Sequence, residues 1–88
     1  MPGIRRKNKT IKVKAGKWVL VDEVYIAAGP KKIPIKTTFG IRIRHTTVAP
    51  PFIRELTFKP GDHVFVLTVH YNKVEVYADG DAVITWKE

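Results

Sequence analysis

The sequence predicts an all-β protein, folded as a small single-domain antiparallel β-sandwich of jelly-roll type or as a closed small barrel, with about seven or eight strands. Apolar and polar residues alternate with a period of two along much of the chain, which is typical of half-buried strands. Short groups of Gly, Pro, Asp and Asn separate the alternating runs and indicate turns. No stretch requires a helix, and 88 residues are enough for only one hydrophobic core.

The first two strands are expected before residue 29. Thr10, Lys12 and Lys14 alternate with Ile11 and Val13, which indicates a short strand that ends at a turn at residues 15–16 and has a basic outward face. Residues 18–28 are apolar on both parities except at Asp22 and Glu23, which indicates a strand covered on both faces or an interrupted one. We expect a β-bulge at these adjacent acids, because a regular strand would point one of them into the core.

The most regular alternation runs from Ile33 to Arg44, after a turn at residues 29–32. Its odd positions are nearly all apolar, whereas its even positions carry three cations, Arg44 among them, and no acid. One continuous strand from Ile33 to Ile43 would span roughly 36 Å at about 3.3 Å per residue, although the radius of gyration of such a domain is only about 12 Å. The strand must therefore bend, and Gly40 is the expected place.

The second half of the chain predicts further strands joined by turns. Residues 46–51 are interpreted as the longest irregular connection, residues 52–58 as a strand, and residues 59–62 as a turn that leads to a hairpin or to a strand change. The last third predicts a three-stranded antiparallel meander. Its strands are expected at residues 63–70, 74–78 and 82–86, with turns at 71–73 and 79–80.

Residues 58–62, the valines at positions 64, 66 and 69, and residues 74–80 resemble the last strands of galectin-like and laminin-G-like jelly rolls. This resemblance implies a sandwich topology. Galectins bind galactosides through a His-x-Asn-x-Arg strand and a Trp followed by Glu-x-Arg. The corresponding stretch here, residues 43–47, has no Asn, and no Trp lies between Trp18 and Trp86, so the galectin site does not carry over.

The positive charge is concentrated in the first half of the chain. Sixteen Lys and Arg against eight Asp and Glu give a net charge of +8. Residues 1–44 contain twelve of these cations and two acids, a net charge of +10, whereas residues 45–88 have a net charge of −2. A basic surface of this kind attracts polyanions. We expect a basic flexible arm at residues 1–9, followed by a single β domain at residues 10–88.

Binding of DNA or RNA through the phosphate backbone, with little sequence preference, is the expected function. The sequence does not identify an exposed aromatic residue for base stacking, because Trp18, Tyr25 and Phe39 lie among residues with the pattern of a core. The nine cations expected to make the contacts are Arg5, Arg6, Lys7, Lys9, Lys12, Lys14, Lys36, Arg42 and Arg44.

Two other functions fit the same sequence. A structural or protein–protein interaction module would pair through exposed strand edges with another chain, or with a second copy of itself. A carbohydrate-binding sandwich would need an exposed Trp or Tyr beside polar side chains. In the first of these alternatives the lysines only keep the protein in solution.

The sequence gives no support for catalysis. Ser and Cys are absent, which excludes Ser-His and Cys-His nucleophilic schemes. His63 and His70 lie on opposite faces of one expected strand, roughly 23 Å apart, so within that strand they cannot share a metal ion. We therefore expect a protein that is not an enzyme and that has no metal or cofactor. The chain has no run of roughly 18 apolar residues and no signal peptide, which predicts a cytoplasmic protein without a membrane segment.

Overall fold

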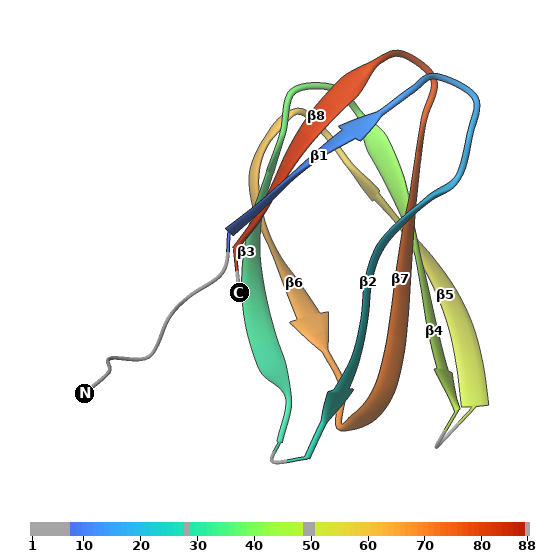
Figure 1. Ribbon diagram of the computed structural model, residues 1–88, viewed down its shortest axis with the longest axis vertical. Helices are drawn as coiled ribbons and strands as arrows, with labels where there is room; N and C mark the ends of the chain where they lie inside the picture. The colour runs from blue at the N-terminus through green and yellow to red at the C-terminus, as the bar shows by residue number, and fades with distance from the viewer. Residues whose placement is uncertain (1–7, 28, 49–50, 88) are drawn as a thin grey trace.

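The computed structural model describes residues 8–27, 29–48 and 51–87, and these form eight strands and no helix (Figure 1). The strands are β1 (Asn8–Val13), β2 (Val19–Ile26), β3 (Lys31–Thr37), β4 (Ile41–Val48), β5 (Pro51–Phe58), β6 (Gly61–Leu67), β7 (His70–Ala78) and β8 (Ala82–Lys87). None of these described residues forms a helix that could span a lipid bilayer.

The strands form two four-stranded antiparallel sheets that pack face to face. Sheet A has the order β1-β8-β3-β6, and sheet B has the order β2-β7-β4-β5. The first strand pairs with the last, the second with the seventh, the third with the sixth, and β4 with β5. The chain is thus one long hairpin whose successive strand pairs alternate between the two sheets, which is the jelly-roll topology. Of the two expected architectures, the structure confirms the sandwich and not the closed barrel.

The core lies between the sheets and receives every second residue of most strands. Ile33 and Ile35 from β3 and Ile41 and Ile43 from β4 are buried, and the residues between them, Pro34 and Arg42, face outward. Burying one such side chain stabilises the fold by about 1.5–3 kcal/mol. The alternation predicted for residues 33–44 is therefore confirmed within both strands, whereas Phe39, which lies between them, is 43% exposed and does not join the core.

The predicted bend at Gly40 separates two strands that belong to different sheets. Strand β3 ends at Thr37 in sheet A, and β4 begins at Ile41 in sheet B. Lys36 and Arg42 consequently face opposite sides of the molecule, because each points away from the core on the outer surface of its own sheet.

The bulge in β2 lies at Val21, one residue before the predicted pair of acids. Leu20 pairs with Glu75 and Asp22 pairs with Val74, so Val21 has no partner on β7. Both Val21 and Asp22 are buried. Asp22 does enter the core. Its Oδ2 accepts a hydrogen bond from Trp86 Nε1 (3.2 Å), and its Oδ1 lies 3.2 Å from Lys9 Nζ. These partners compensate for the loss of water around the carboxylate.

Several predictions for the second half of the chain are wrong. Strands β6, β7 and β8 alternate between the sheets and do not form a meander, so residues 79–80 do not close a hairpin. Residues 46–48 and 51, which were expected in an irregular connection, belong to β4 and β5, and Val48 pairs with Pro51 across the β4–β5 hairpin. Residues 71–73 lie inside β7, and the turn comes before them, between Leu67 and His70.

A buried polar network holds this turn. His45 and Asn72 are fully buried, and His45 Nε2 donates to Asn72 Oδ1 over 2.7 Å. The Asn72 amide donates to the Thr68 carbonyl (2.8 Å), and Asn72 Oδ1 accepts the Thr68 N–H (3.0 Å). Arg54 Nε donates to His45 Nδ1 (3.1 Å), and Arg54 Nη2 donates to the Val66 carbonyl (3.0 Å), which links the edge strands of the two sheets. No buried side-chain nitrogen or oxygen of the described residues lacks a partner.

Candidate polyanion-binding face

The outer surface of sheet A, here called the sheet A face, carries an excess of lysine. Its strands point their buried residues toward sheet B and their alternate residues outward. The outward residues are Thr10 and Lys12 from β1, Val83, Thr85 and Lys87 from β8, Lys32, Pro34 and Lys36 from β3, and Asp62, Val64 and Val66 from β6. This face therefore has four lysines and one acid.

Strand pairing brings lysines together that are far apart in the sequence. Lys36 lies opposite Thr85 on β8 and opposite Asp62 on β6. Lys87 is two residues beyond Thr85 on the same outward side, and such diagonal neighbours have Cα atoms about 7–8 Å apart. Lys12 lies opposite Val83, two residues to the other side of Thr85. Phosphate groups along a nucleic acid strand could thus meet ammonium groups from three adjacent strands.

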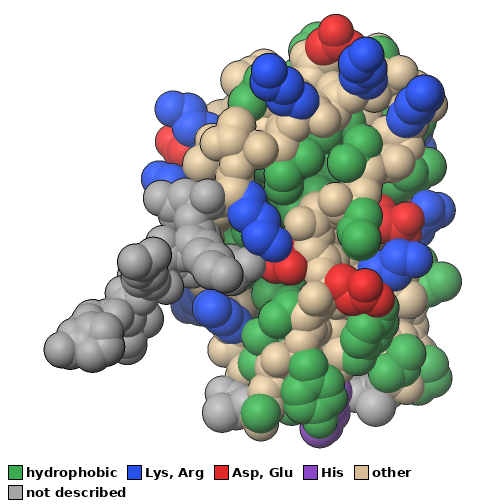
Figure 2. Space-filling model, viewed as in Figure 1, with side chains coloured by type: hydrophobic (Ala, Val, Ile, Leu, Met, Phe, Trp, Pro, Cys, Tyr) green, Lys and Arg blue, Asp and Glu red, His purple; other side chains and the backbone are tan. Residues whose placement is uncertain are grey.

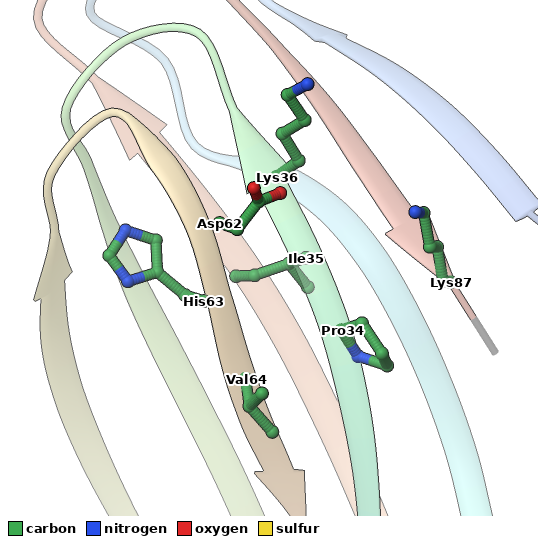
Figure 3. A pocket seen from close by; sticks show the side chains of 7 residues that line it. All are labelled: Pro34, Ile35, Lys36, Asp62, His63, Val64 and Lys87. Atoms are coloured by element: carbon green, nitrogen blue, oxygen red, sulfur yellow. The ribbon is translucent and has the colours of Figure 1, made fainter.

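A shallow hollow of about 420 Å³ lies among these residues, lined by Pro34, Ile35, Lys36, Asp62, His63, Val64 and Lys87. Figure 3 shows Lys36, Asp62 and Lys87 reaching out from neighbouring strands around it, whereas the His63 ring points away from the two ammonium groups. The His63 ring stacks on Phe58 with centroids 4.6 Å apart, and His63 Nε2 donates to the Lys59 carbonyl. His63 is therefore held by its own contacts and not by the lysines.

The ammonium groups of the four lysines on the sheet A face are free to bind an anion. None of them forms an ion pair or side-chain hydrogen bond within residues 8–27, 29–48 and 51–87. Asp62, the one acid among them, leaves this face with three positive charges in excess. A surface of this kind attracts anions, and the attraction weakens with salt.

The outer surface of sheet B, the sheet B face, is balanced in charge. Its three cations and three acids are Arg42, Arg44, Lys73, Glu23, Glu55 and Glu75. Arg44 Nε donates to Glu75 Oε1 (3.2 Å), and the Arg44 guanidinium lies 4.1 Å from the centre of the Trp18 ring. The Arg42 guanidinium lies 4.8 Å from the centre of the Tyr77 ring. The two arginines are therefore engaged with Glu75 and with the rings of Trp18 and Tyr77.

The structure divides the nine cations predicted as contacts. Lys12 and Lys36 share the sheet A face, and exposed Lys14 follows the end of β1. Arg42 and Arg44 belong to the sheet B face, whereas Lys9 lies within β1 and pairs with Asp22. The remaining three, Arg5, Arg6 and Lys7, lie outside the described residues, as does most of the arm predicted at residues 1–9.

Two lysines of the sheet A face, Lys32 and Lys87, were missed by sequence reasoning. Lys32 was assigned to the turn before β3, although its parity with Pro34 and Lys36 already placed it on their side of the strand. Lys87 extends the outward series of Val83 and Thr85 beyond the predicted end of the last strand. In both cases the alternation includes the lysine, but the predicted strand was too short to contain it.

No protein-family model and no curated protein sequence matches this chain. Within the described part of the chain, no group of three His, Asp or Glu side chains is arranged to hold a metal ion.

Proposed function

We propose that the protein binds the phosphate backbone of nucleic acids through the sheet A face, with little preference for base sequence. The observation that supports this function best is the charge of that face, where four lysines without an ion pair among the described residues stand against one acid, beside a balanced sheet B face. Lysines that neutralise phosphates release condensed counterions, which supplies most of the affinity of non-specific binding.

The residue types on this face favour contacts with the backbone over contacts with bases. The outward positions of sheet A hold Lys, Thr, Val, Pro and Asp, and no aromatic ring among the residues described. Proteins that hold single strands by their bases stack them on aromatic side chains. Lysine contacts to phosphate position a nucleic acid without reading its sequence.

Two double variants with the same change in net charge test the proposal. Lys36→Glu with Lys87→Glu reverses charge on the sheet A face, and Arg42→Glu with Lys73→Glu reverses it on the sheet B face. Affinity for labelled single- and double-stranded DNA and RNA is measured at about 50 mM salt and at higher salt, after thermal unfolding confirms that each variant is folded. We expect the first variant to lose at least about tenfold in affinity and about two units of salt slope. The second should lose much less.

Two results would contradict this function. One is a wild-type protein that binds no tighter than roughly 10⁻⁴ M, which is the weak limit of non-specific binding. The other is an equal loss in both double variants, because net charge alone would then explain the binding.

A further inference from the structure

One end of the sheet B face is apolar across all four strands. Tyr25 on β2 pairs with Tyr71 on β7, and Val48 on β4 pairs with Pro51 on β5. The last pair between β4 and β7 is Thr47 with Asn72, so Val48 and Tyr71 come next in the same register and the four residues form one row. Ile53 is two residues beyond Pro51 on the same side of β5, and it lies in the neighbouring row opposite Thr46. We call these five residues the apolar end. In Figure 2 hydrophobic side chains gather at the lower end of the molecule, where Figure 1 places the β4–β5 hairpin and the ends of β2 and β7.

The apolar end is unusually exposed for its composition. Tyr25 is 64% exposed, Val48 58% and Ile53 66%. Single exposed apolar residues are normal, whereas a contiguous group on one face marks an interaction surface.

The tyrosines of the apolar end are held in place. Tyr71 Oη donates a hydrogen bond to Glu23 Oε2, and Tyr25 Oη lies 3.1 Å from His70 Nδ1. The Tyr25 and His70 rings are also in contact, with centroids 5.7 Å apart. Side chains that are ordered before binding lose less conformational entropy when a partner docks.

From these features we propose that the apolar end is the contact between two copies of this chain, related by a two-fold axis. The distribution of charge favours a second copy of this chain as the partner. Two molecules that each carry +8 repel one another, and the repulsion is weakest when they meet through a surface without net charge, as on the sheet B face with its equal numbers of cations and acids. The lysine-rich sheet A faces then lie on the far sides of the pair.

Opposite charges stand side by side next to the apolar end. Glu23 on β2 pairs with Lys73 on β7, in the row that follows Tyr25 and Tyr71. A two-fold contact repeats every interaction twice, so Glu23 of one copy can face Lys73 of the other and the reverse. Charge complementarity of this kind sets the register of an interface more than its strength.

The contact is small, so the dimer is weak. Five side chains bury less than the roughly 800 Å² per partner of a standard stable interface. A dissociation constant on the order of 10 µM to 1 mM is expected.

Sedimentation velocity over about 1 µM to 1 mM protein, without nucleic acid, tests the dimer independently of the proposed function. The decisive variant is Val48→Lys, and its matched control is Val64→Lys on the sheet A face, since both valines are 58% exposed. We expect wild type and Val64→Lys to dimerise with rising concentration, and Val48→Lys to shift the dissociation constant upward by at least about tenfold. A wild type that stays monomeric throughout, or an equal effect of both variants, overturns the proposal.

A charge exchange tests the pairing of Glu23 with Lys73. Glu23→Lys and Lys73→Glu should each weaken self-association, because two like charges then meet across the axis. An equimolar mixture of the two variants should recover the dimer, since a copy with two lysines meets a copy with two glutamates. If the mixture associates no better than either variant alone, the proposed orientation is wrong.

Discussion

His45 is the residue whose surroundings determine its protonation most clearly. Its ring makes edge contacts with the rings of Phe52 and Phe65, with centroids 5.9 and 5.1 Å away. Arg54 can only donate, so His45 Nδ1 must accept and His45 Nε2 must carry the proton that it donates to Asn72. Burial lowers the pKa of His45 below its ordinary value; the hydrogen bond to Asn72 acts in the opposite direction, and the charge of Arg54 lowers the pKa further.

The buried His45 should make the stability of the protein depend on pH. Its folded pKa is lower than its unfolded pKa of about 6.5, so the unfolded chain binds more protons between these two values. The stabilisation by neutral His45 is therefore complete above the unfolded pKa, and it decreases as the pH falls from there through the folded pKa. Each unit of pKa difference corresponds to about 1.4 kcal/mol in the free energy of unfolding.

Urea unfolding of wild type and His45→Gln between about pH 5 and 8 measures this effect. Gln keeps a hydrogen-bonding side chain and cannot titrate. The free energy of unfolding should decrease more steeply toward acidic pH in wild type than in the variant. Parallel curves would show that His45 does not contribute to the acid sensitivity.

At the scale of the strand, local patterns predicted faces well and pairing poorly. The alternation of residues 33–44 correctly identified the buried isoleucines, because side-chain direction in a strand depends only on parity. The turn signals at Pro60-Gly61 and Asp79-Gly80 belong to crossings between the sheets, whereas Val48 and Pro51 close the β4–β5 hairpin. Whether a turn closes a hairpin depends on the sheet that the next strand joins, which is determined by distant residues.

The same limit explains what could be predicted of the candidate site. Lys12 and Lys36 each showed an outward parity, but their common face follows from the pairing of β8 with both β1 and β3. Arg42 showed the same parity as Lys36, and the crossing at Gly40 places it on the opposite surface. Asn72 was interpreted as a turn residue because of its type, although it holds the preceding turn with its side chain from inside β7.

Two glycines next to strand ends should respond differently to substitution. Gly61 has φ of +122°, a conformation that L side chains rarely adopt, so Gly61→Ala should destabilise the fold by about 1–3 kcal/mol. At Gly40 a Cβ atom would meet only the Phe58 carbonyl oxygen, at an ordinary contact distance of 3.8 Å. Gly40→Ala should change stability by less than about 1 kcal/mol, in either direction. Urea unfolding of both variants checks this difference, and a larger loss at Gly40 would contradict it.

For the whole molecule, the nested strand pairing implies an order of folding. The β4–β5 hairpin joins neighbours in the chain, whereas the β1–β8 pair joins Asn8 to Lys87. The entropy lost in closing a loop grows with its length, and each inner pair brings the ends of the next pair closer together. Folding should therefore begin at β4–β5 and end at β1–β8, at the slow rates of β proteins with many long-range contacts.

Matched Ile→Val substitutions at the two ends of this order test it. Ile43 in β4 pairs with Leu56, and Ile84 in β8 pairs with Ile11; both isoleucines are buried. Each variant should lose about 0.5–1.5 kcal/mol of stability. Stopped-flow folding and unfolding in urea then separate the rates: Ile43→Val should mainly slow folding, and Ile84→Val should mainly accelerate unfolding. The reverse assignment would mean that the chain ends meet before the central hairpin forms, and the jelly roll would then fold from its outermost pair inward.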